Sequence, residues 1–176
     1  MTTTEPITDL AGGGDGGRPV ARPEVEDFLF HEAHLLDTWQ LDAWVGLFVP
    51  DARMEVTSTD WQGWDSDQGG SFVADDWDLI NARVRRLKSR KAHAENPRSR
   101  THRLVGNVRL TDRSGPVLGV AANFVVHRFR DLQTFSYVGR YEHVLRVGPE
   151  GLRMVLRRTV LTHEAMAPGA RLSFIL

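Results

Sequence analysis

Glu32 occupies a position that packing alone does not explain. Val25, Phe28, Leu29 and Trp39 form the apolar stripe of a helix expected to begin at Pro23. At about 100° per residue, Glu32 falls inside that stripe. A carboxylate there is either hydrogen-bonded within the core or poised as an acid–base group with a raised pKa. We favour a buried structural role and keep the acid–base role as the alternative.

Two histidines are the candidate partners of Glu32 in that alternative. Side chains alternate along a strand, so His102 shares a face with Leu104, and His127 shares one with Phe129. If both faces line the inside of a curved sheet, Glu32 with His102 or His127 forms a carboxylate–imidazole pair able to transfer protons. Buried histidines are more often structural, which weighs against catalysis.

A second set, His31, His34 and Asp37, has the residue types of a metal site. On the helical wheel, however, the three side chains spread over about 120°, opposite the apolar stripe. Ligands that diverge in this way do not converge on one ion. We therefore predict a solvated or interface face and no metal ligands in this chain.

Length and composition indicate one ordinary globular domain. The chain has 176 residues, 41% of them hydrophobic, and a net charge of −1. No window of about 18 apolar residues and no signal peptide pattern is present, which predicts a cytoplasmic protein without a membrane partner. The absence of cysteine excludes disulfides, thiol nucleophiles and an iron–sulfur cluster held by this chain's own thiolates. No phosphate-binding or dinucleotide-binding glycine motif precedes a helix, and nothing in these residues alone identifies a reaction.

The charges are unevenly distributed along the chain. Residues 1–78 contain 17 acidic residues against three arginines, whereas residues 83–103 are strongly basic. A basic stretch can bind nucleic acid, but the chain has no nucleic-acid-binding motif and its isoelectric point is about 6.7. Arginine outnumbers lysine 20 to 2, which favours ion pairs with carboxylates. We therefore expect protein contacts and no nucleic acid.

The element pattern is that of an α+β fold. A glycine-rich arm over residues 1–22 precedes a single domain over 23–176. Within the domain we expect helices from Pro23, over Asp42–Phe48 and from Asp75, and then a long antiparallel meander curved around them. The expected strands are 52–58, Ser99–Leu110, Val117–Arg130, Thr134–Val147, Leu152–His163 and a short terminal piece, Leu172–Leu176. Trp61 and Trp64 lie on a loop, Asp60–Ser71, where exposed tryptophans indicate a covered surface.

Several ordered motifs resemble the β (small) subunit of bacterial aromatic-ring-hydroxylating (Rieske-type) dioxygenases. The resemblance covers about residues 23–176, and its most specific part is PRSRTHRLVGNV. The motifs are VEDFLFHEAHLLD at Val25–Asp37, WVGLFVPD at Trp44–Asp51, the segment Asp76–Leu87, NPRSRTHRLVGNVRL at Asn96–Leu110, NFVVHRFR at Asn123–Arg130 and LRRTVL at Leu156–Leu161.

The resemblance implies a cone-shaped fold like that of scytalone dehydratase and nuclear transport factor. It also implies a large (α) subunit as partner, commonly in an α3β3 assembly, that holds both the Rieske [2Fe–2S] cluster and the mononuclear Fe(II). The small subunit would then have a structural role in cis-dihydroxylation during aromatic catabolism. Under this hypothesis Arg98, Arg100 and Arg103 are expected to be ion-pair anchors within or between subunits. The alternative is a stand-alone dehydratase or isomerase that uses Glu32.

Overall fold

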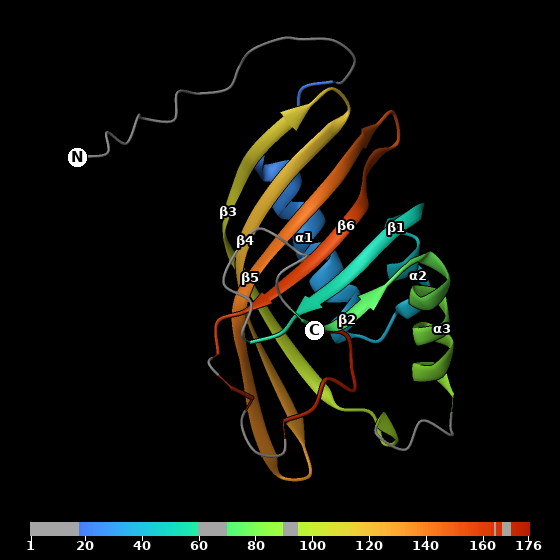
Figure 1. The fold of residues 1–176 in the computed structure, drawn as a ribbon, viewed down its shortest axis with the longest axis vertical. Coiled ribbons are helices and arrows are strands. Elements are labelled where there is room, and N and C mark those ends of the chain that lie inside the picture. Colours follow the sequence, from blue (N-terminus) through green and yellow to red (C-terminus); the bar gives the residue numbers. More distant parts are fainter. Residues whose placement is uncertain (1–17, 60–69, 90–94, 164, 167–169) are drawn as a thin grey trace, which may run out of the picture.

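The computed structural model describes residues 18–59, 70–89, 95–163, 165–166 and 170–176. Within these ranges, three helices and six strands follow one another along the chain; Figure 1 shows their arrangement. They are α1 (Arg22–Asp37), α2 (Leu41–Val45), β1 (Phe48–Thr57), β2 (Ser71–Asp75), α3 (Trp77–Lys88), β3 (Arg100–Ser114), β4 (Val117–Arg130), β5 (Gln133–Gly148) and β6 (Gly151–Leu161).

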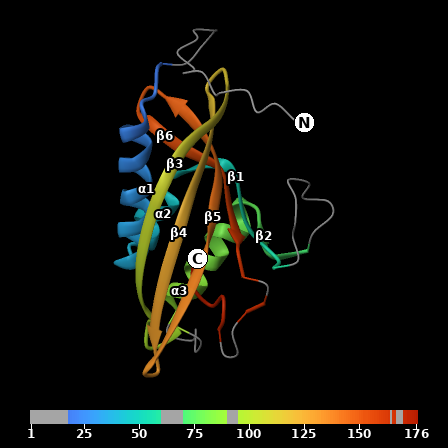
Figure 2. The same ribbon diagram turned by 90° about the vertical axis from the view of Figure 1, so that its left-hand side faces the viewer.

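All six strands belong to one sheet in the order β2-β1-β6-β5-β4-β3. The four C-terminal strands form an antiparallel meander in which each strand pairs with its neighbour in sequence. β1 pairs parallel to β6 and antiparallel to β2, which places the N-terminal strands at the opposite edge from β3. The long strands twist and curve, and α1 lies against one face of the sheet (Figure 2).

The sequence of helix α1 has a favourable first turn and one apolar face. Pro23 stands in its first turn together with the acidic Glu24, as helix starts favour. Val25 and Leu29 are fully buried against the sheet, and Glu32 continues the same buried row. The helix ends at Asp37, after which Trp39 takes a positive φ of 57° that turns the chain toward α2.

Helix α3 is fixed at its start by a capping carboxylate. Asp76 accepts a hydrogen bond from the backbone N–H of Leu79 at 3.0 Å. Ile80 and Val84 are buried against β1 and its neighbours. Before the cap, Asp75 receives two bonds from Arg83, at 2.5 and 3.0 Å, which tie the end of β2 to the helix.

The core lies between the inner face of the sheet and the three helices, and the C-terminal segment Leu172–Leu176 enters it. Along β4, alternate side chains from Leu118 to Arg128 are buried and their neighbours face outward. Phe174 and Leu176 pack with Tyr137 and other residues at one end of the core, while Ile175 joins the larger cluster under α1.

The expected α+β architecture with a curved sheet is confirmed, but several boundaries differ. The second helix stops at Val45, because Phe48 already begins β1. Strand β2 begins at Ser71, the last residue of the expected loop, and Leu172–Leu176 forms no strand. Residues 1–17 of the expected arm lie outside the described residues, and Arg22 already belongs to α1. No described helix is long and apolar enough to cross a membrane.

Candidate functional site

Glu32 is the centre of a buried ion pair that joins the first helix to the last strand. Its Oε1 lies 2.6 Å from Nε of Arg157 and accepts a second hydrogen bond from the indole N–H of Trp44 at 3.1 Å. The two charged residues are 2% and 1% exposed. Arg157 also donates to the hydroxyl of Thr159 at 3.0 Å. The favoured structural interpretation of Glu32 therefore agrees with this geometry.

The electrostatics of this pair oppose an acid–base role for Glu32. Burial alone would raise the pKa of the Glu32 carboxyl, but the Arg157 guanidinium, the His143 imidazole and the hydrogen bonds from Arg157 and Trp44 together hold the pKa below its usual value. Glu32 is therefore ionised near neutral pH, and its charge is already neutralised by Arg157. A general acid would need the opposite shift.

Next to the pair, Tyr141 and His143 on β5 form a buried aromatic stack. Their rings lie 5.1 Å apart with an interplanar angle of 21°, and the Arg157 guanidinium lies 5.0 Å from the Tyr141 ring. Among the described residues, neither ring nitrogen of His143 has a hydrogen-bond partner. Burial, opposed by Glu32 and aided by Arg157, lowers the pKa of His143 to about 4, so the ring is neutral at pH 7.

The structure does not bring His102 or His127 to Glu32. The two histidines face each other across β3 and β4 on the outer face of the sheet. Side chains alternate along β3, so His102 points outward because the neighbouring Arg103 points inward and contacts α1. On β4, His127 Nδ1 lies 2.8 Å from the hydroxyl of Ser136. The predicted shared pocket is therefore wrong, because both histidines project from the face opposite the core.

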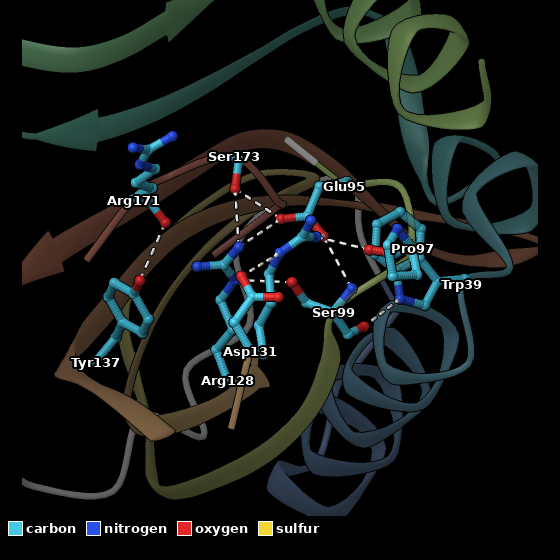
Figure 3. A network of polar contacts seen from close by, with 10 residues as sticks. Trp39, Glu95, Pro97, Ser99, Arg128, Asp131, Tyr137, Arg171 and Ser173 are labelled. Atoms are coloured by element: carbon cyan, nitrogen blue, oxygen red, sulfur yellow. Dashed lines mark hydrogen bonds and ion pairs between the residues drawn. The ribbon is translucent and has the colours of Figure 1, made fainter. Parts of the chain in front are cut away.

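A second buried charge cluster lies at the far end of the core, around Glu95 (Figure 3). Arg128 donates to Glu95 Oε1 at 2.9 Å, and the backbone N–H of Ser99 donates to Oε2 at 3.0 Å. Ser173 of the C-terminal segment donates to the same carboxylate at 2.6 Å. Burial raises the pKa of Glu95, but the hydrogen bonds from Ser173 and Ser99 and the charge of Arg128 together hold it below its usual value. Glu95 thus ties β4, the start of β3 and the C-terminal segment together.

The three arginines proposed as anchors have different environments. Arg103 is buried and donates to the Asp37 carboxylate, to Thr101 and to the backbone oxygen of Ile175. Arg98 is exposed, and its guanidinium lies 5.2 Å above the Trp39 ring. Arg100 is exposed at the start of β3. Only Arg103 is a buried anchor within the chain, so a role of Arg98 or Arg100 between subunits stays a prediction.

The other sequence-predicted residues are not brought into one site. His31 and His34 are exposed on α1, whereas Asp37 accepts bonds from Thr101 and from the backbone N–H of Arg103. Within the described ranges, no three histidine or carboxylate side chains are grouped closely enough to hold a metal ion. Trp61 and Trp64 lie outside the described residues.

A row of charges crosses the outer face of the sheet from β1 to β5. Arg158 donates to Glu55 at 2.8 Å and lies 3.7 Å from Glu142. Arg140 donates to Glu142 at 2.8 Å. Nearby, Leu104 and Val138 are exposed apolar side chains on the same face. This face therefore combines apolar and charged groups, as protein interfaces do.

Sequence reasoning missed Arg157, Arg128, Glu95 and His143. A signal existed for the two arginines: each stands at an inward position of its strand, where Arg128 follows Phe124 and Val126, and Arg157 precedes Thr159. A charged residue at a core position indicates a buried partner. The identity of that partner depends on the tertiary fold.

The sequence of the chain matches a known protein family over most of its length. Residues 31–167 match the family model described as the ring hydroxylating beta subunit. The chain belongs to this family. The β subunit is also 43% identical over 158 residues to the small oxygenase component of the p-cumate 2,3-dioxygenase system of Pseudomonas putida, covering 89% of this chain and 88% of the relative. It is thus a small oxygenase component of an aromatic-ring-hydroxylating dioxygenase.

Solved structures agree with the fold of the β subunit. The beta subunit of benzoate 1,2-dioxygenase from Burkholderia mallei superposes with a TM-score of 0.73 at 23% identity, over 90% of this chain and 99% of that one. A putative scytalone dehydratase from Novosphingobium aromaticivorans gives a TM-score of 0.59 at 14% identity, over 85% and 93%. The expected cone fold is therefore confirmed.

Proposed function

We propose that this β subunit is a non-catalytic, structural component and that a large subunit performs the cis-dihydroxylation of the aromatic substrate. The observation that carries the proposal is the closed Glu32–Arg157 pair. The one carboxylate that sequence reasoning placed in the core as a possible acid or base is ionised, doubly hydrogen-bonded and neutralised. Its proposed imidazole partners lie on the opposite face of the sheet.

The cofactors are proposed to lie in the partner. A Rieske [2Fe–2S] centre needs two thiolates and two imidazoles, and this sequence has no cysteine. We infer that the large subunit holds the cluster and the mononuclear Fe(II), and that the two chains assemble as α3β3 in the cytoplasm. The mixed apolar and charged outer face of the sheet supports a protein partner.

Co-expression with a large subunit tests the assembly. We expect the two chains to co-purify in equal amounts with a mass of three copies of each, and the small subunit alone to be colourless and inactive. Failure to associate would overturn the proposal.

Variants of the buried aromatic stack test the non-catalytic role. Tyr141→Phe and His143→Leu each remove one ionisable group from the core. In the assembled enzyme, both should keep kcat/KM within about twofold of the parent, because a group that does not act in the transition state contributes nothing to this ratio. A hundredfold loss with assembly intact would show that this chain takes part in the chemistry.

A further inference from the structure

His102 of β3 and His127 of β4 are a directly opposed pair on the outer face of the sheet. His102 is exposed and His127 is partly buried. Opposed residues of an antiparallel pair have Cβ atoms roughly 5 Å apart. Zn²⁺ binds imidazole nitrogen at about 2.0 to 2.1 Å, so two nitrogens on one ion lie roughly 3 Å apart. Two imidazoles that start from opposed positions of a sheet are within reach of this spacing.

Contacts on the inner face of the sheet hold the backbone on both sides of His102. Thr101 donates a hydrogen bond to the Asp37 carboxylate of α1 at 2.8 Å, and the backbone N–H of Arg103 donates to the same carboxylate at 2.9 Å. On β4, both residues adjacent to His127 are buried. Because side chains alternate along a strand, the two imidazoles are held on the outer face.

The ring of His127 also has neighbours that orient it. Its Nδ1 lies 2.8 Å from the hydroxyl of Ser136 on β5, and the Phe129 ring lies 6.4 Å away along β4. When Nδ1 carries the proton and donates to this hydroxyl, the lone pair of Nε2 is free to bind a metal ion. Metal-binding histidines commonly donate their second ring N–H to such a partner, which fixes the orientation of the ring.

The groups around the pair determine which kind of ion it suits. The neighbouring positions on this face are Arg100, Leu104, Val125, Phe129, Thr134 and Val138. None of these is a carboxylate, and the charge of Arg100 opposes any cation, although solvent screens it. Mg²⁺ and Ca²⁺ require several oxygen ligands, so the pair does not suit them. Imidazole nitrogens suit Cu²⁺, Ni²⁺ and Zn²⁺, of which Cu²⁺ binds most tightly.

We propose that His102 and His127 form a two-histidine binding site for a divalent transition metal ion, with Cu²⁺ preferred, and that Ser136 orients His127 through Nδ1. Water completes the coordination, since the part of the chain that the structure describes holds no group of three histidine or carboxylate side chains close enough to share an ion. With two protein ligands the ion is exchangeable, and it links β3 to β4 on the outer face. The proposal does not depend on the proposed structural role.

Isothermal titration of the full chain, without a histidine tag and stripped of metal by a chelator, measures this site. We expect one Cu²⁺ to bind per chain, Zn²⁺ to bind more weakly and Mg²⁺ not to bind. Ser136→Ala should weaken Cu²⁺ binding by about tenfold, because it removes the hydrogen-bond partner of a ligand. His102→Ala and His127→Ala should each weaken it further than Ser136→Ala does, because each removes a ligand.

His34→Ala is the matched control, because it removes an exposed imidazole from α1. It should leave the affinity for Cu²⁺ within about twofold of the parent. Cu²⁺ binding that survives both His102→Ala and His127→Ala, or that His34→Ala removes, would overturn the proposal. If an alanine variant does not unfold cooperatively, His102→Gln and His127→Gln serve in its place with the same expected losses.

Electron paramagnetic resonance with less than one equivalent of Cu²⁺ gives a second readout on the unaltered chain. The spectrum should show coupling of the copper to two imidazole nitrogens, and that of His102→Ala should show coupling to one. Coupling to a single nitrogen in the unaltered chain would overturn the proposal. Neither experiment involves a large subunit, so failure here is distinct from failure of the proposed structural role.

Discussion

Glu32 and Arg157 lie 125 residues apart in sequence and meet with 2.6 Å between Oε1 and Nε. The contact connects α1 to β6 across the full thickness of the core. Both side chains are buried, so each depends on the other for the neutralisation that water would otherwise provide. Substitution of either residue alone should therefore lower the free energy of unfolding by more than the loss of one hydrogen bond would.

Glu32→Gln should lower the free energy of unfolding by about 3 to 5 kcal/mol, because it leaves the Arg157 guanidinium buried without a counter-charge. Urea denaturation of the isolated chain measures the change. The matched control is Glu24→Gln, which breaks the exposed Arg18–Glu24 pair and should change the free energy of unfolding far less. The double variant Glu32→Leu with Arg157→Met should recover most of the loss, and equal destabilisation by Glu32→Gln and Glu24→Gln would contradict the assignment.

His143 predicts a loss of stability on mild acidification. Its pKa is about 4 in the folded chain and about 6.5 when unfolded, so between these values the unfolded state binds more protons and stability falls as the pH falls. Between pH 7.5 and 5 the loss should be about 2 kcal/mol. Glu32, whose pKa lies below its usual value, contributes its own loss only at lower pH.

Urea denaturation of His143→Leu at both pH values isolates the contribution of His143. The variant should lose about 2 kcal/mol less than the parent over this pH range. His102→Ala, at an exposed histidine, is the matched control for the removal of an imidazole. If the stability of His143→Leu fell with pH as much as that of the parent, the imidazole would not be the responsible group.

Substitutions of Arg103 and Arg100 should have very different effects on stability, although the two residues stand three positions apart. Arg103→Met removes the counter-charge of Asp37 and the side-chain donor to the Ile175 oxygen, and should cost about 3 kcal/mol. Arg100→Met, at an exposed position, should change stability by less than about 0.5 kcal/mol. Thermal unfolding of the two isolated variants checks this difference, and co-purification with the large subunit then tests Arg100 as an intersubunit contact. Similar melting temperatures for both would refute the distinction.

Gly139 should not tolerate a side chain. A Cβ at this position would stand 2.1 Å from the backbone oxygen of Val160 and 3.0 Å from the ring of Phe124. Gly139→Ala should therefore destabilise the chain by about 1 to 3 kcal/mol, since β5 and β6 must move apart. Gly106→Ala is the control, because nothing lies within 4 Å of its Cβ position. Denaturation midpoints that coincide for the two variants would contradict this close approach.

The sequence was sufficient for the elements that have a clear period. Alternation along Val117–Arg130 predicted β4 to the residue, and the apolar stripe with its acidic start predicted α3 closely. The position of Glu32 in the stripe of α1 also predicted its burial correctly. These features depend only on residues close together in the sequence, so the spacing of apolar residues is enough to predict them.

The features that sequence reasoning missed depend on contacts between distant segments. Alternation assigns His102 and His127 to a face but does not say which face meets the helices, and that choice was wrong. The partner of Glu32 required the register of β6 against the rest of the sheet. Strand β2 has five residues and follows a long connection, so it gains its structure from β1 rather than from its own pattern.

The parallel pairing of β1 with β6 bears on the order in which the chain folds. β3 to β6 can assemble as successive hairpins, each closing a short loop. β1 instead pairs with a strand about a hundred residues away, and closing so long a loop costs conformational entropy before the contacts between β1 and β6 form. We expect the hairpins to belong to the folding nucleus, with the arrival of β1 and β2 as the late and slow event.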